Sequence, residues 1–246
     1  MEEIKPNINE SFTEENILNI DEETKRILLE TMKAEKGDYW EKTIIAGEMA
    51  LLGMNVLDNL SEEDKEKMRQ ELENVRASLK DTEDKEDYVD LARGIYRFKN
   101  IELNYPQLTD KEKEILESLP ALFRQNPEWH GHLNYIPQIA KALNKNIDEI
   151  SNNKDYELAR KYIEEKLKED GEEELMNMIL SGLLVELNED EAKKLLKSES
   201  WHENRWSEVL KMVREAKNNE QGYFLARCLP PLRKLIEFRE NINFRK

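Results

Sequence analysis

The sequence of 246 residues contains one cysteine, eight glycines and seven prolines. The single cysteine, Cys228, excludes an intramolecular disulfide and a metal site built from several cysteines. It lies among Leu225, Leu229 and Leu232, which predicts a small buried side chain rather than a reactive thiol. Valine and threonine occur six times each, so the residues that favour strands are scarce. These shortages predict an all-α protein with short connections between its helices.

Long hydrophobic runs and familiar catalytic motifs are also missing. No apolar run is long enough to span a bilayer, and the first residues lack the apolar core of a signal peptide. We therefore expect a cytoplasmic protein that does not enter a membrane. There is no phosphate-binding glycine loop, Ser-His-Asp set or Cys-His pair. The sequence therefore assigns no reaction and no cofactor to the chain, and it favours a binding role over an enzymatic one.

The formal net charge is −16, and it is unevenly distributed. Residues 1–90 carry 26 acidic and 12 basic side chains, a net charge of −14. So acidic a surface repels nucleic acids, which makes them poor partners. Residues 223–246 reverse the trend with six basic and two acidic side chains. This basic end either binds an acidic partner or folds against the acidic first part of the same chain.

One tripeptide occurs three times at a constant spacing of 67 residues: Leu91-Ala92-Arg93, Leu158-Ala159-Arg160 and Leu225-Ala226-Arg227. A tyrosine closely precedes each copy (Tyr88, Tyr156 and Tyr223). A fixed period is typical of stacked helical units that bury their apolar faces against their neighbours. The pattern predicts a helical-repeat, solenoid-like array of about ten helices, with two packed helical lobes as the alternative arrangement.

The apolar pattern predicts a flexible lead-in over residues 1–15 and a single helical array over residues 16–246. A seam between two lobes is possible at residues 104–108, where Tyr105-Pro106 interrupts the pattern. Helices are expected at 16–35, 38–57 and 172–187. Three helix starts are predicted from a capping residue with an acid three positions later, at Ser61, Thr109 and Asn188.

Two details of this helix pattern bear on the later argument. The segment 38–57 is apolar on nearly all sides, which predicts a central buried helix. Its polar residues Glu41, Glu48 and Asn55 recur every seven positions, and we interpret them as the one exposed edge of that helix. Pro230-Pro231 is predicted to end one helix and begin a last one over residues 231–242.

The repeated arginines are the first candidates for a binding surface. If the units stack, Arg93, Arg160 and Arg227 line up on one face and bind carboxylates or phosphates. The alternative is that each arginine pairs with a glutamate of its own or the next unit. Trp129 and Trp201, at loop-to-helix junctions, either pack against a turn or anchor a partner. The sequence favours a protein–protein interaction scaffold or adaptor whose partner, a protein or peptide, offers acidic and apolar groups.

Two other classes of function stay open. Residues 136–150 loosely resemble part of a helix-turn-helix unit, which suggests a nucleic-acid-binding regulator using residues 136–168 and the basic C-terminus. Against this, Asp148 and Glu149 repel phosphate at the place where a recognition helix would begin. A metal-dependent helical enzyme is the other alternative, with the three histidines His130, His132 and His202 as ligands. Nothing in the sequence brings these histidines together.

Overall fold

The structure, a computed structural model, describes residues 12–35, 37–80, 82, 84–169 and 171–244. In these ranges the protein has no strand, and the predicted all-α class is confirmed. The α-helices are α1 (Glu14–Leu18), α2 (Glu22–Ala34), α3 (Tyr39–Leu51), α4 (Glu62–Ser78), α5 (Tyr88–Ile101), α6 (Asp110–Gln125), α7 (Ile136–Leu143), α8 (Asn153–Lys166), α9 (Glu172–Leu187), α10 (Glu189–Leu196), α11 (Trp206–Asn218) and α12 (Gly222–Phe244). Short 3-10 helices connect some of them: η1 (Leu57–Asn59), η2 (Lys85–Asp87), η3 (Pro127–Tyr135), η4 (Ile147–Glu149) and η5 (Glu203–Arg205).

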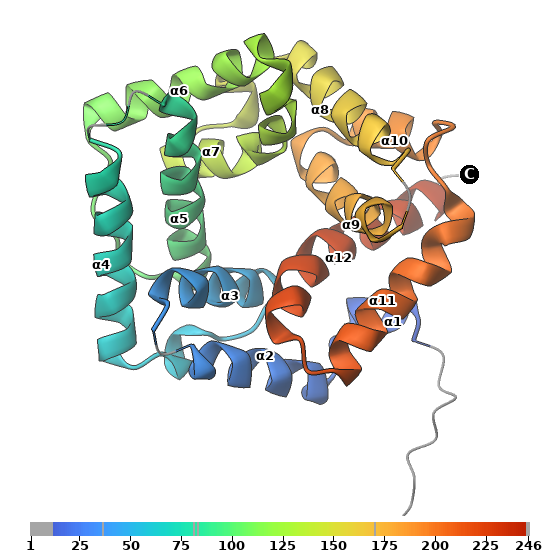
Figure 1. The fold of residues 1–246 in the computed structure, drawn as a ribbon, viewed down its shortest axis with the longest axis horizontal. Helices are drawn as coiled ribbons and strands as arrows, with labels where there is room; N and C mark the ends of the chain where they lie inside the picture. Colours follow the sequence, from blue (N-terminus) through green and yellow to red (C-terminus); the bar gives the residue numbers. More distant parts are fainter. Residues whose placement is uncertain (1–11, 36, 81, 83, 170, 245–246) are drawn as a thin grey trace, which may run out of the picture.

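The helices form two concentric rings (Figure 1). The outer ring consists of α2, α4, α6, α8, α10 and α11, and the inner ring of α3, α5, α7, α9 and α12. Around the inner ring each helix contacts the next: α3 with α5, α5 with α7, α7 with α9, α9 with α12, and α12 again with α3. The helical array therefore closes on itself, so the inner helices all face a common centre.

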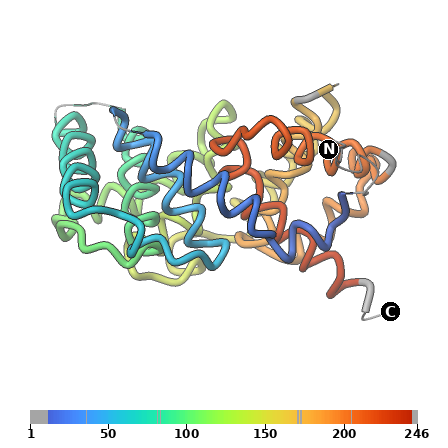
Figure 2. Tube along the Cα trace, turned by 90° about the horizontal axis from the view of Figure 1, so that it is seen from below, coloured from blue at the N-terminus to red at the C-terminus, as the bar shows by residue number. Residues whose placement is uncertain are grey.

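Closure joins the two ends of the described chain. Seen edge-on, α2 lies beside α12 (Figure 2), and α12 contacts α1, α2 and α3. Within the basic segment, Arg239 lies 3.6 Å from Glu14, and Lys217 of α11, just before that segment, binds both Asp21 and Glu23. The basic C-terminal segment thus folds against acidic residues near the start of the chain, which was one of the two possibilities that the charge distribution left open.

Several local predictions are confirmed. Ser61, Thr109 and Asn188 each accept a hydrogen bond from the backbone N–H three residues later, so they cap α4, α6 and α10. The segment predicted at 172–187 is α9. The single helix expected at 16–35 is instead two, because Asp21 caps a new start by accepting from Thr24 N at 2.8 Å. Residues 1–11 of the predicted lead-in lie outside the described residues.

The expectation that Pro230-Pro231 separates two helices is wrong. Helix α12 runs through both prolines. A proline inside a helix has no N–H to donate, so the carbonyls four residues earlier, on Ala226 and Arg227, lose their usual partners. Burial on both sides of the pair offsets this loss, since the apolar residues around it are packed against α9 and α3. Tertiary packing here outweighs the local preference.

The hydrophobic core follows the rings as one cluster, from Ile17 in α1 to Phe238 in α12. Cys228 is fully buried in it, as predicted. Helix α3 is buried along most of its length, which confirms its predicted central place. No helix in the described part of the chain is long and apolar enough to cross a membrane.

Candidate functional site: a cationic pocket at the centre of the ring

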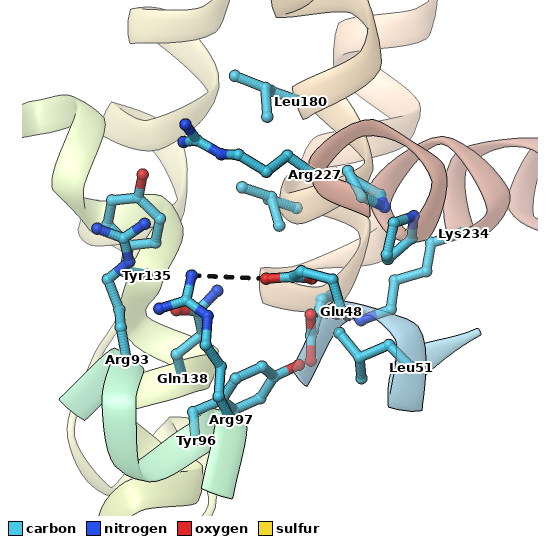
Figure 3. A pocket seen from close by; sticks show the side chains of 14 residues that line it. Glu48, Leu51, Arg93, Tyr96, Arg97, Tyr135, Gln138, Leu180, Arg227 and Lys234 are labelled. Carbon is cyan, nitrogen blue, oxygen red and sulfur yellow. Dashed lines mark hydrogen bonds and ion pairs between the residues drawn. The ribbon is translucent and has the colours of Figure 1, made fainter. Parts of the chain in front are cut away.

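The inner helices surround a pocket at the centre of the ring, which we call the central pocket (Figure 3). All five inner helices contribute to it, and its polar lining residues are Glu48, Arg93, Tyr96, Arg97, Tyr135, Gln138, Glu186, Arg227 and Lys234. Its cavity volume is about 50 Å³, which exceeds the roughly 10–15 Å³ that one water molecule needs. The pocket is therefore small, and its charged groups lie among apolar walls supplied by Leu51, Leu180, Leu183, Pro230 and Pro231.

The deepest pair in the pocket joins α3 to α5. Arg97 lies 3.5 Å from Glu48 through Nη2, and the two side chains are only 5% and 13% exposed. Gly47 permits this arrangement, because a Cβ at that position would lie 2.6 Å from Arg97 Cβ. The expectation that Glu48 forms an exposed helix edge is wrong, since the closed ring brings α5 and α12 over that side of α3.

Burial changes the proton affinities of both groups. Removal from water raises the pKa of Glu48, and this effect is larger than the opposing attraction of Arg97 and Arg93. Burial likewise lowers the pKa of Arg97, and the neighbouring cations Arg93 and Arg227 lower it further. A single contact of 3.5 Å is long for a charged hydrogen bond. The Arg97 guanidinium is thus buried with much of its hydrogen-bonding capacity unused.

Two further arginines face the same space from α5 and α12, as Figure 3 shows. The Arg93 guanidinium stacks on the Tyr135 ring at 4.5 Å and pairs with Asp90 at 3.0 Å. Arg227 is exposed, and its guanidinium lies 5.7 Å from the Tyr223 ring. Stacking holds a guanidinium plane in place while leaving its N–H groups free to donate. These two arginines therefore remain available to an anion.

The central pocket carries an excess of positive charge, whereas the chain as a whole is acidic. Four cationic side chains line it, together with the two carboxylates Glu48 and Glu186. Lys234 is already paired with Glu186 at 2.5 Å. The remaining three guanidiniums are opposed by two carboxylates, Glu48 in the pocket and Asp90 beside Arg93, so the pocket keeps an excess of one positive charge within a protein of net charge −16. A local excess of this sign attracts an anionic group.

A second pocket adjoins the first. It has a cavity volume of about 220 Å³ and shares Tyr135, Leu180 and Leu183 with the central pocket as wall residues. Its remaining lining residues are Glu128, Gly131, His132, Asn134, Tyr162, Ile163 and Asn177. We call it the side pocket. Aromatic and aliphatic side chains supply much of its wall, and polar groups are interspersed among them.

Unpaired polar atoms concentrate in these two pockets. Among the described residues, the buried side-chain atoms without a hydrogen-bond partner include Nε of Arg93 and of Arg97, Oε1 of Gln138, Oδ1 of Asn134 and Nδ1 of His132. The first three residues line the central pocket and the last two the side pocket. Buried polar groups normally find partners, and leaving one unpaired costs about 1–3 kcal/mol. A bound polar ligand would supply the missing partners.

The three repeated arginines do not share one surface. Arg93 and Arg227 lie on inner helices and meet at the central pocket, whereas Arg160 lies on the outer helix α8. Arg160 binds Glu164 of its own helix and, at 2.7 Å, Glu191 of α10. The alternative raised from the sequence, pairing with nearby glutamates, thus describes Arg160. The three copies of the tripeptide therefore differ in their surroundings.

The two tryptophans lie outside both pockets. Trp201 is buried against Trp206 with ring centroids 6.3 Å apart, and its indole N–H donates to Glu203 at 2.7 Å. Trp129 is partly buried and packs against the core at η3. Both tryptophans therefore contribute to the packing of loop-to-helix junctions.

The three histidines have separate neighbours. His132 packs against Phe123 and Tyr135, with ring centroids at 5.3 and 6.2 Å, and burial together with Arg93 lowers its pKa. His130 approaches the Arg124 carbonyl at 3.4 Å. His202 contacts Glu174 on α9 at 2.9 Å. In the ranges that the structure describes, no cluster of three or more His, Cys, Asp or Glu side chains is placed to hold a metal ion.

The segment considered as a helix-turn-helix, residues 136–168, is built into the rings. Its first helix is α7, an inner helix that is buried almost throughout. Its second helix, α8, is an outer helix, and Asp148 before it accepts a hydrogen bond from Tyr156 at 2.7 Å. Neither helix stands free of the rest of the molecule.

Sequence patterns did not point to most of the central pocket. Arg97, Gln138 and Lys234 carry no motif, and Glu48 was assigned to an exposed edge. One available signal was the four-residue spacing of Arg93 and Arg97, which places both side chains on the same side of α5. The contribution of α12 required knowledge of ring closure, because Arg227 and Arg97 are 130 residues apart in sequence.

No protein-family model matches this chain, and no curated protein or solved structure matches it either. Its function therefore has to be inferred from the geometry of the central and side pockets.

Proposed function

We propose that this chain is an interaction protein that binds an anionic group of a protein or peptide partner in its central pocket. The observation that carries the proposal is Arg97, which is 5% exposed and makes one 3.5 Å contact with Glu48. A buried guanidinium is stabilised only when its N–H groups are well paired. An incoming oxyanion would complete that pairing, with Arg93 and Arg227 as additional donors.

Binding, rather than catalysis, is the activity that this chemistry supports. Arginines hold and orient oxyanions, but their high pKa makes them unsuited to proton transfer. The central pocket contains no histidine, cysteine or serine among its lining residues. The surrounding ring is held by packing on both sides of every inner helix, which favours a preformed site.

The test is selection of random eight-residue peptides, displayed with free C-termini or followed by a fixed neutral tail, against the full chain. Binding of the enriched peptides is then measured by calorimetry for the wild type, for Arg93→Gln with Arg227→Gln, and for Arg160→Gln. We expect the double variant to lose at least tenfold in affinity, equivalent to about 1.4 kcal/mol, and the Arg160 variant to bind normally.

The Arg160 variant is a matched control because it alters the same tripeptide outside the pocket. If the double variant does not fold, Arg227→Gln alone serves, since this exposed side chain has no ion pair with a carboxylate among the described residues. Failure to enrich any peptide, or equal binding by wild type and double variant, would refute the proposed function.

A further inference from the structure

From the central and side pockets together, we infer that the ligand is a carboxylate next to an amide N–H and a bulky side chain, as at the C-terminus of a peptide. This inference rests on the proposed function, because it specifies the group that the same site binds. Its basis is the arrangement of unpaired donors and acceptors across the two adjoining pockets.

The arginines of the central pocket provide the hydrogen-bond donors. Nε of Arg93 and Nε of Arg97 are both buried and unpartnered, and both side chains line the central pocket with Arg227. A planar carboxylate matches the planar fork of a guanidinium. A phosphate dianion fits less well, because it would approach the carboxylates of Glu48 and Glu186 in the same pocket.

Unpartnered hydrogen-bond acceptors line the same two pockets. Oε1 of Gln138 and Oδ1 of Asn134 are unpartnered, and these side chains belong to residues only 7% and 8% exposed. They require N–H donors, which a simple anion does not have. The backbone N–H beside a C-terminal carboxylate is such a donor. We assign this single N–H to Gln138, which lines the central pocket with the arginines, so that one molecule satisfies the guanidiniums and this amide oxygen together.

The side pocket accommodates the side chain of the residue that carries the carboxylate. Its volume of about 220 Å³ and its walls of Tyr135, Tyr162, Leu180 and Leu183 suit an aromatic or aliphatic side chain. Gly131 keeps this space in its present shape, since a Cβ there would lie 2.8 Å from the Tyr162 ring. A chain end also enters a pocket ringed by five helices more easily than an internal segment, which has to enter and leave.

The experiment uses defined small probes with the full chain: N-acetyl-leucine, N-acetyl-phenylalanine, N-acetyl-phenylalaninamide, acetate and inorganic phosphate. Affinities come from calorimetry, and NMR follows the arginine Nε–H signals assigned to Arg93 and Arg97. We expect saturable binding of N-acetyl-phenylalanine or N-acetyl-leucine that is at least tenfold tighter than that of acetate, phosphate or the amide. Both arginine signals should shift.

Gln138→Leu separates the amide contact from the carboxylate contact. This substitution should weaken binding of the N-acetyl amino acids severalfold while leaving acetate binding unchanged. Arg227→Gln should weaken the binding of acetate and of the N-acetyl amino acids. If Gln138 had a purely structural role, the substitution would change the affinities for acetate and for the N-acetyl amino acids by the same factor. That result would overturn the assignment of Gln138.

The outcomes distinguish this inference from the proposed function. Equal binding of the acid and the amide, tighter binding of phosphate alone, or no saturable shift with either N-acetyl amino acid overturns the carboxylate assignment. If displayed peptides still bind through Arg93 and Arg227 in that case, the proposed function stands with another anion as its ligand. If the N-acetyl amino acids bind but no peptide is enriched, the site is correct and the partner is a small molecule.

Discussion

Arg227 and Arg160 end the same tripeptide, yet they lie in opposite environments. Arg227, on the inner helix α12, is exposed at the central pocket, and no carboxylate is paired with it among the described residues. Arg160, on the outer helix α8, is 16% exposed at its side chain and bound by Glu164 and Glu191. The leucine and alanine before each arginine behave more alike, since Ala226 and Ala159 are fully buried.

This contrast shows what the tripeptide specifies. Leucine and alanine direct one side of the helix into the core, whichever ring the helix belongs to. The arginine next to that apolar stripe then reaches whatever space lies beside it. For α12 this space is the centre of the ring, and for α8 it is the contact with α10. The inner copy is available for binding, whereas the outer copy stabilises the packing.

The largest effect expected from a single change concerns the helix crossing that places Arg227. A Cβ on Gly182 of α9 would lie 1.8 Å from the Pro231 carbonyl oxygen of α12. Gly182→Ala should therefore separate the two helices and lower the free energy of unfolding by about 4 kcal/mol, as severe overpacking does. Urea denaturation checks this value. Gly37→Ala is the control, because a Cβ there meets nothing within 4 Å and should change stability by less than about 0.5 kcal/mol.

The next effect concerns the buried pair. Arg97→Ala leaves Glu48 buried without its cation and should lower the free energy of unfolding by about 3 kcal/mol at neutral pH. Burial raises the folded-state pKa of Glu48 above the ordinary value of a glutamate. Because this pKa is raised, the free energy of unfolding decreases as pH rises through the folded-state pKa and the buried carboxyl group ionises.

The variant should therefore regain stability relative to wild type as pH falls from neutral and Glu48 becomes protonated, which thermal melts at several pH values would measure. Adding Glu48→Gln to Arg97→Ala removes the ionisable group, so the pH dependence specific to the variant should disappear. An Arg97→Ala variant as stable as wild type at pH 7 would show that the pair is not buried in solution.

The smallest expected change in stability comes from replacing the repeated arginines, and it tests the difference between the inner and outer copies directly. Arg160→Gln breaks contacts with two carboxylates and should cost about 1–2 kcal/mol in chemical denaturation. Arg227→Gln, made in the same tripeptide, should leave stability nearly unchanged and reduce ligand binding. If both variants affect stability and binding alike, the inner and outer copies are equivalent and the central pocket has no special role.

Local sequence patterns predicted much of the secondary structure. The caps at Ser61, Thr109 and Asn188 depend on a side chain and a backbone N–H three residues apart, so they could be predicted without knowledge of the fold. The same approach failed at Pro230-Pro231, where the helix-breaking tendency of proline is outweighed by packing that involves distant helices.

The central pocket depended on contacts that no local pattern contains. The spacing of Arg93 and Arg97 was visible, but their meeting with Glu48 of α3 and Arg227 of α12 follows from closure of the inner ring. Glu48 shows the limit most clearly. Its seven-residue spacing with Glu41 and Asn55 resembles an exposed edge, and only the helices packed over it make it buried.

From the sequence alone, one could derive the all-helical class, the starts of several helices, and the burial of Cys228 and of most of α3. These properties arise from interactions within a few residues and from the period of apolar side chains. Closure of the array, the two repeated arginines that face its centre and the carboxylate beside them follow only from how distant helices pack. Those outcomes depend on the summed packing of residues far apart in the chain, and a period along the sequence does not encode which helix ends on the inside.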